Sequence, residues 1–268
     1  PEFKPEIVEA CARHGIRAID PWRDQVAAVG LDRAVKAVRD AGLELSGYCR
    51  GGMFTSDASR RTEVRDDNRR CVDEAKALGA PCIVLVVGGL PQYSRPGSAA
   101  SKDIAAARAQ VHDAIAEMLE YARQASMPLA IEPLHPQYAA DRSAVNTVAQ
   151  ARRMCEQLNA PGASDVGIAI DAYHVWWDDT LETELRLAGA QGWIHAFHVC
   201  DWKAQQSDAL NDRGLMGEGC IDLRRLRHLV EAAGFAGDIE VEIFSTRYWA
   251  MDQHEYLQRI IAAYEAHL

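Results

Sequence analysis

Short apolar runs rich in β-branched residues alternate along this chain with longer segments of helical periodicity. Helical periodicity is clearest at 60–78, 103–124 and 223–233, and Gly15, Gly42 and Gly234 stand where a helix ends and a strand is about to begin. A repeated strand–loop–helix unit predicts a parallel sheet covered by helices. The expected strands are 16–20, 43–49, 82–87, 128–133, 166–171, 194–200 and 239–244.

Open and closed parallel sheets share this alternation, so a further signal is needed to choose between them. The chain has no GxGxxG or GxxxxGKS phosphate loop, which disfavours the open nucleotide-binding sheets. We therefore expect one (β/α)8 TIM-barrel domain over residues 1–268, a normal length for this architecture. A full barrel needs an eighth strand, but the opening segment PEFKPEIVEACARHG has the pattern of a loop and a helix. The first strand is thus expected to be supplied by residues absent from this sequence, or to leave a gap between the first and last strands.

Composition restricts the classes of partner. The chain is 48% hydrophobic and carries a formal net charge of -10, so it can bury a large core while its field repels phosphate backbones and anionic membranes. We therefore expect no nucleic-acid and no membrane partner. The seven cysteines are scattered without a CxxC pair, and no signal peptide or apolar run of about 20 residues is visible, so we expect a cytoplasmic protein with reduced thiols.

Charged or imidazole side chains stand at the ends of four expected strands, where barrel enzymes place their chemistry. These side chains are Glu132, Asp171, His198 and Glu242. Taken alone, each is equally well explained as a salt bridge inside the barrel. Three carboxylates and one imidazole at one barrel mouth would repel one another without a cation, so together they predict one divalent metal ion. Three oxygens and one nitrogen suit Mn²⁺ first, with Mg²⁺, Co²⁺ and Zn²⁺ as alternatives.

The motifs AIEPLHP, IDAYHVWWD, HAFHVCDW and VEIFS, in this order, resemble the sugar phosphate isomerase/epimerase superfamily with its xylose-isomerase-like barrel. Ketose 3-epimerases, hydroxypyruvate isomerase and inosose dehydratase are members. The resemblance implies that the four side chains named above hold the metal. It leaves His195 as a core or supporting residue and makes Glu240 a weaker ligand candidate than Glu242.

The same resemblance implies two substrate contacts, His174 and Arg213. Met216 stands where the family loop has a proline, which puts the substrate's identity in doubt more than the metal. The endonuclease branch of the superfamily needs extra histidines on two strands, and the strand ends GYCRGG and VLVVGG offer none. DNA-repair activity is therefore disfavoured.

Further candidates follow the strand ends. His135 is a candidate acid or base, or simply part of a loop. Trp22, Arg23 and Arg50 are candidates for substrate contact, and salt bridges or helix capping explain the two arginines equally well.

Three other features have a possible structural explanation. Trp176 and Trp177 suit a sugar-pocket wall or a contact with a second copy of the chain, which is compatible with a homo-oligomer. Arg142 is equally a candidate site residue or the partner in an ion pair with neighbours of Asp141 that has no chemical role. The charged run 60–70 is most simply a solvated helix face.

These residues favour proton transfer next to the carbonyl of a small sugar or polyol, through a metal-stabilised enediolate. One of Glu132 and Glu242 would remove the α-proton and the other would return it, giving isomerisation or epimerisation. A second hypothesis is a lyase or dehydratase that expels a β-leaving group, with His135 or His174 as proton donor. The third is a barrel that binds sugar without turnover.

Overall fold

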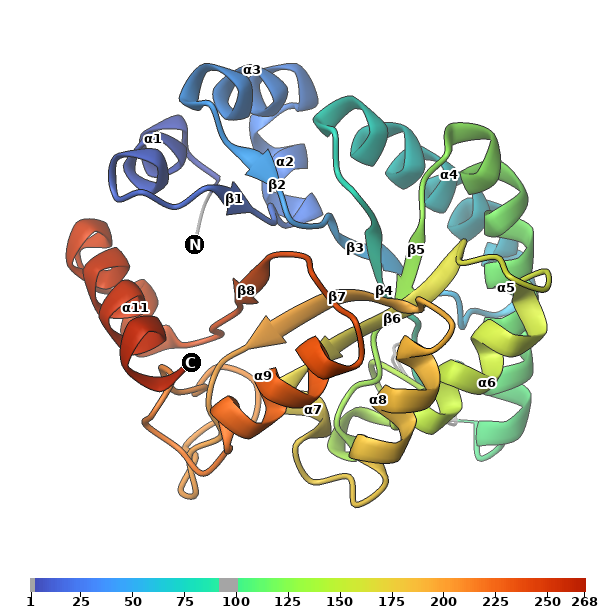
Figure 1. Cartoon of the computed structure of the whole chain (residues 1–268). Coiled ribbons are helices and arrows are strands. Elements are labelled where there is room, and N and C mark those ends of the chain that lie inside the picture. The colour runs from blue at the N-terminus through green and yellow to red at the C-terminus, as the bar shows by residue number, and fades with distance from the viewer. Residues whose placement is uncertain (1–2, 92–100) are drawn as a thin grey trace.

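Parallel strands curl around one axis with helices on the outside (Figure 1), in a computed structural model that describes residues 3–91 and 101–268. The strands are β1 (Ala18–Ile19), β2 (Glu44–Leu45), β3 (Cys49–Gly52), β4 (Ile83–Val86), β5 (Leu129–Ile131), β6 (Val166–Asp171), β7 (Ile194–Val199) and β8 (Ile239–Val241). The α-helices are α1 (Pro5–Arg13), α2 (Arg23–Val29), α3 (Leu31–Ala41), α4 (Arg61–Leu78), α5 (Ile104–Ala125), α6 (Val148–Leu158), α7 (Ala172–Val175), α8 (Leu181–Gly189), α9 (Leu223–Ala232), α10 (Thr246–Trp249) and α11 (Gln253–His267). Two short 3-10 helices, η1 (Ala58–Arg60) and η2 (Pro136–Tyr138), complete the described elements.

All strand pairs are parallel and follow the order of the sequence. β3 to β8 form one six-stranded sheet, and β1 pairs with β2 in a second, two-stranded sheet. A bridge between Trp22 and Cys49 continues the order from one sheet to the next. The predicted α/β TIM-barrel fold is confirmed, with its strands in sequential order.

The expected strand 43–49 is wrong in one respect, because the chain forms two short strands there. Ser46 donates its N–H to Ile19 O at 3.1 Å, whereas Tyr48 donates to Cys82 O at 3.1 Å. The segment therefore changes its hydrogen-bonding partner from the strand on one side to the strand on the other. Regular strand pairing therefore stops at the end of β2, at Leu45, and resumes at the start of β3, at Cys49.

The helix ends agree with their glycine signals. Gly15, Gly42 and Gly234 have φ angles of 78°, 68° and 98°, a left-handed region that a residue with a Cβ atom rarely adopts.

Side chains on the two faces of the strands differ in size. The outward-facing side chains of the central strands are large and pack against the helices, among them Ile83, Leu85, Leu129, Ile131, Ile168 and Ile170. The inward-facing side chains are smaller and form their own cluster: Cys49, Cys82, Val84, Ala130, Ala169 and Ala196. Because successive side chains alternate between faces, the residue two positions beyond each inward side chain also points into the barrel.

A seam separates the first strand from the last. Within the described ranges, no strand pairs with β8 on its outer side or with β1 on the side away from β2. A groove of about 550 Å³ runs between them and is lined mainly by apolar side chains, including those of α1, α11 and the two strands. Ser46 Oγ donates to Glu240 Oε2 across the seam at 2.9 Å, and Arg17 pairs with Asp238. The described residues place no strand between β1 and β8, which agrees with either arrangement predicted for strand 1.

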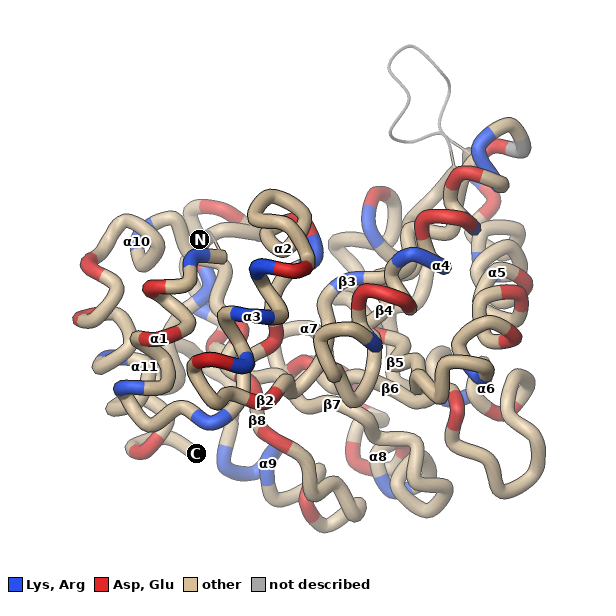
Figure 2. The backbone as a smooth tube through the Cα atoms, turned by 90° about the horizontal axis from the view of Figure 1, so that it is seen from above, with Lys and Arg blue, Asp and Glu red and all other residues tan. Residues whose placement is uncertain are grey.

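Charged residues concentrate on the outer helices, where both signs alternate along α4 (Figure 2). Most charged side chains of the run 60–70 are exposed or half-buried, in agreement with a solvated helix face. Among the described helices, none is both long and apolar enough to cross a membrane.

Candidate metal centre

Four side chains converge inside the barrel at the carboxyl ends of neighbouring strands. Glu132 follows β5, Asp171 ends β6, His198 lies near the end of β7 and Glu242 follows β8. The first three each stand two residues beyond an inward-facing alanine, so the strand pleat directs them into the barrel. One ligand atom from each of the four lies within 4.8 Å of the others.

The cluster contains polar atoms that no protein group satisfies. Glu132, Asp171 and His198 are 4%, 0% and 1% exposed. Glu132 Oε1 and both ring nitrogens of His198 have no hydrogen-bond partner, since the contact from Nδ1 to Oε1 measures 3.6 Å. A buried polar atom without a partner costs about 1–3 kcal/mol. A divalent cation bound by these atoms would remove that cost, so the residues fit the predicted metal.

The electrostatics of the cluster also point to a missing positive charge. Burial raises the pKa of Asp171 to about 7, with the carboxylates of Glu242 and Glu132 adding to the effect against the attraction of Arg213. Burial likewise raises the pKa of Glu132. Burial opposes the charged form of His198, yet Glu240 and Glu132 raise the pKa of the imidazole well above its usual value. In the metal-free protein the cluster thus favours proton binding by these groups, which is the behaviour of a site that lacks positive charge.

Arg213 supplies the one guanidinium in direct contact with the cluster among the described residues. It is 2% exposed, and its Nη1 donates to Glu242 Oε2 at 2.8 Å and to Asp171 Oδ2 at 3.2 Å. The rings of Tyr173 and Phe244 lie 4.3 and 4.7 Å from its guanidinium carbon. The arginine is therefore fixed by charge and by aromatic contacts on two sides.

His174 lies beside the same arginine. It is 3% exposed, and its Nδ1 accepts the backbone N–H of His135 at 3.2 Å. Burial and the neighbouring charge of Arg213 lower the pKa of His174 well below its usual value, so its imidazole is neutral.

Two further acidic side chains, Asp20 and Glu240, lie on the other side of His198 from Glu132. His198 Nε2 is 3.8 Å from Glu240 Oε2, and ligand atoms of Asp20, His198 and Glu240 also lie within 4.8 Å of one another. Because Nδ1 faces Glu132, Nε2 is the nitrogen left to carry a proton toward Glu240. These two carboxylates thus suit the role of proton acceptors that orient the imidazole. Glu240 and Glu242 are two residues apart, and this spacing in a strand places both side chains on the same face.

A cavity of about 30 Å³ opens next to the centre, lined on one side by Glu132 and Glu242. Four side chains predicted to contact substrate line it: Trp22, Arg50, His174 and Arg213. Arg142 and Tyr138 also line it, so of the two readings of Arg142 its position agrees with that of a candidate site residue.

Other predicted residues lie away from the described cavity. The ring of His135 packs 4.7 Å from Trp202 and 5.7 Å from Trp177, and it is absent from the cavity lining. Trp176 also packs against Trp202, at 5.8 Å. His195 contacts Ser164 Oγ at 2.9 Å.

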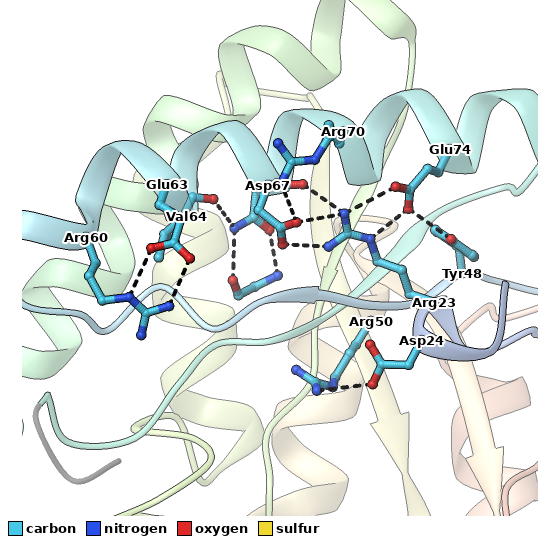
Figure 3. A network of polar contacts seen from close by, with 12 residues as sticks. Arg23, Asp24, Tyr48, Arg50, Arg60, Glu63, Val64, Asp67, Arg70 and Glu74 are labelled. Atoms are coloured by element: carbon cyan, nitrogen blue, oxygen red, sulfur yellow. Dashed lines mark hydrogen bonds and ion pairs between the residues drawn. The ribbon is translucent and has the colours of Figure 1, made fainter. Parts of the chain in front are cut away.

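Arg23 has a structural position. Its guanidinium contacts Asp67 Oδ2 at 2.6 Å and Glu74 Oε2 at 2.7 Å, both on α4 (Figure 3). Of the two readings of this residue, the geometry favours the salt bridge.

Comparison with known proteins gives a family match over almost the whole chain. The family model described as xylose isomerase-like TIM barrel matches residues 8–264. An inosose isomerase of Halalkalibacterium halodurans is 23% identical over 205 residues, which are 75% of this chain and 67% of that protein.

Solved structures agree with this match. Protein SMc04130 of Sinorhizobium meliloti 1021 is 52% identical with a TM-score of 0.90, and the alignment covers 98% of this chain and 92% of that one. The IOLI protein, solved with a bound zinc atom, is 20% identical with a TM-score of 0.81 over 99% of this chain and 92% of the other. At 20% identity, the likeness to the IOLI protein shows the fold alone.

Proposed function

Because this chain belongs to the xylose isomerase-like TIM barrel family, we propose that it is a divalent-metal-dependent isomerase or epimerase of a small sugar or polyol. The observation that carries the proposal is the convergence of Glu132, Asp171, His198 and Glu242 within 4.8 Å, with buried atoms that lack partners. The isomerase name of the Halalkalibacterium relative supports the same reaction class. Mn²⁺ is the proposed metal, because a site with three oxygen ligands and one nitrogen ligand suits this ion.

The two glutamates are proposed as the proton-transfer groups. A bound divalent cation supplies Lewis-acid polarisation of a carbonyl and its neighbouring hydroxyl. Glu132 and Glu242 come from strands β5 and β8 and both line the cavity, so their carboxylates can face a substrate carbon from different sides. One carboxylate removes the α-proton and the other delivers a proton to the opposite face or to the adjacent carbon. Arg213 holds the carboxylate of Glu242 in position at 2.8 Å.

Glu242→Gln tests this assignment, because the amide keeps an oxygen for the metal but cannot accept the proton. The Mn²⁺-loaded protein is incubated in D₂O with a panel of ketoses and keto-inositols, and deuterium at the α-carbon is followed by NMR. We expect incorporation in the wild type and a loss of about 100-fold or more in the variant, where 100-fold is the lower end of the range for a general base.

The control is Glu182→Gln, whose carboxylate is 63% exposed and pairs with Arg225 on the surface. It should exchange deuterium like the wild type. Near-normal exchange by a metal-loaded Glu242→Gln variant would make Glu242 a ligand only, and His174 would become the better base. A wild type that binds no divalent metal by elemental analysis, or that exchanges no panel member, contradicts the proposed function.

The position of His174 on the cavity favours β-elimination as a second candidate activity. Its neutral imidazole would donate a hydrogen bond to the departing oxygen, and the carboxyl group that has taken the α-proton would pass that proton to the leaving group. Product analysis on the same panel separates the two activities, since a dehydrated product appears only in elimination.

A further inference from the structure

The charges around the cavity are unevenly paired. Three arginines line it, and Arg213 is the one whose charge is taken up by the carboxylates of Asp171 and Glu242. Arg50 and Arg142 lie on the same cavity, and the centre's carboxylates make no ion pair with either of them among the described residues. Their charges are therefore open to a ligand.

Arg50 extends from β3 and is only loosely paired. Its Nε is buried without a hydrogen-bond partner. Its one ion pair within the described part of the chain is with Asp24 Oδ2 at 3.7 Å, beyond hydrogen-bond distance, and the Asp24 side chain is 72% exposed. An exposed pair of this kind contributes little, since water screens both charges.

Arg142 lies in the loop between η2 and α6. Its guanidinium carbon sits 5.8 Å from the ring centre of Tyr138, and the described residues place no carboxylate within ion-pair distance of it. Tyr138 is held in turn by its hydroxyl, which donates to Ala209 O at 2.6 Å. An aromatic platform thus positions the guanidinium and leaves its N–H groups free for another partner.

Arginines with structural roles in this chain are paired differently. Figure 3 shows Arg23 held between Asp67 and Glu74, while Arg50 reaches only Asp24. The chain carries 39 acidic and 29 basic residues, so carboxylate partners are plentiful. Arg50 and Arg142 therefore differ from Arg23, whose charge is taken up by two carboxylates.

Charge balance at the centre leads to the same point. A divalent cation together with Arg213 balances the three carboxylates of Glu132, Asp171 and Glu242, while Asp20 and Glu240 lie beside His198 and do not line the cavity. The positive charges of Arg50 and Arg142 remain on the cavity wall, and a neutral sugar would offer neither of them an anionic partner. A terminal phosphate or carboxylate matches the planar, forked N–H donors of arginine.

We propose that the substrate of the proposed isomerase or epimerase is a sugar with an anionic group, a phosphate or a carboxylate, which Arg50 and Arg142 bind at the end away from the carbons that exchange protons. The inference rests on the proposed function for the position of those carbons.

Three ketoses that differ only at carbon 6 test the proposal: D-fructose, D-fructose 6-phosphate and D-fructuronate. Each is titrated by calorimetry into the Mn²⁺-loaded full chain at low ionic strength. We expect at least one anionic ketose to bind about ten-fold or more tightly than fructose, the factor for a charge-assisted contact. Preference for the phosphate or for the carboxylate then identifies the source of the negative charge.

Arg50→Gln and Arg142→Gln should each remove most of that gain, so that the anionic ketoses bind little more tightly than fructose does to the same variant. Arg186→Gln, an exposed arginine on α8, makes the same charge change elsewhere and should behave as the wild type. The proposal is overturned if fructose binds as tightly as both anions, if the gain survives in both cavity variants, or if the metal-loaded chain binds none of the three. Metal content and deuterium exchange are measured on the same samples, so failure of the proposed function is seen separately.

Discussion

Single residues decide the charge state of the centre. Asp171 is fully buried, and its two oxygens have different tasks: Oδ1 accepts the N–H of Tyr173 at 2.8 Å and caps α7, while Oδ2 faces Arg213. A carboxylate in such a place keeps a proton more readily than one in water, because burial disfavours its charged form. Metal binding must therefore displace that proton.

Asp171→Asn should separate metal binding from folding. The folded pKa of Asp171, about 7, is raised above the unfolded value of about 3.9, so the folded metal-free protein binds more protons between these pH values. Its free energy of unfolding should fall as pH rises from about 4 to about 7, and the Asn variant should show a shallower slope because it lacks the contribution of Asp171. Urea unfolding of EDTA-treated protein at a series of pH values measures it.

The same variant should bind Mn²⁺ on the order of 100-fold more weakly, since outer-shell changes alone cost 10–100-fold. Loss of the folded state in Asp171→Asn would instead assign the carboxylate a structural role.

At the scale of elements, the sequence predicted the strands better than their pairing. All seven expected strand segments contain strand residues, and α4 and α5 lie within one residue of the predicted 60–78 and 103–124. The division of 43–49 could not be predicted, because the hydrogen bonds of Ser46 and Tyr48 depend on neighbours 27 and 34 residues away.

Within the site the same contrast holds. The strand-end positions of Glu132, Asp171, His198 and Glu242 follow from local pattern, and the structure brings them together. The place of Arg142 on the cavity depends instead on the path of a long loop and on the ring of Tyr138. Tyr138 lies only four residues before Arg142, but no periodic pattern in this loop indicates that the two side chains meet at the cavity.

Helices α2 and α4 are joined by Arg23, and this tie gives a prediction at the element scale. The Arg23 side chain is 15% exposed and contacts two carboxylates of α4. Arg23→Gln should lower the free energy of unfolding by about 1–3 kcal/mol, because it leaves partly buried carboxylates without their partner.

Arg70→Gln is the matched control. Arg70 also pairs with Asp67, but its side chain is 61% exposed, so its removal should change stability by no more than about 0.5 kcal/mol. Equal effects of the two variants in urea unfolding would show that burial of Arg23 is not what matters.

At the scale of the whole molecule, the seam leaves the strands beside it with a neighbour on one side only, whereas strands away from it have a neighbour on each side. β5 and β6 are paired on both sides, whereas β8 pairs with β7 alone in the described structure. Amide hydrogen exchange should accordingly be slowest in β5 and β6 and faster in β1 and β8, since edge strands open locally at lower free energy. Uniform protection from β1 to β8 in metal-free protein would contradict this gradient.

The seam also changes what a cation would do for the fold. Three of its proposed ligands stand on adjacent inner strands, but Glu242 follows the edge strand β8, 110 residues beyond Glu132 along the chain. A bound ion would act as a cross-link that closes a loop of this length, and a long closed loop restricts the unfolded chain more than a short one. Adding Mn²⁺ would then slow amide hydrogen exchange in β8 more than in β5. Occupancy of the metal centre could thus be followed by the protection of the edge strand of the barrel.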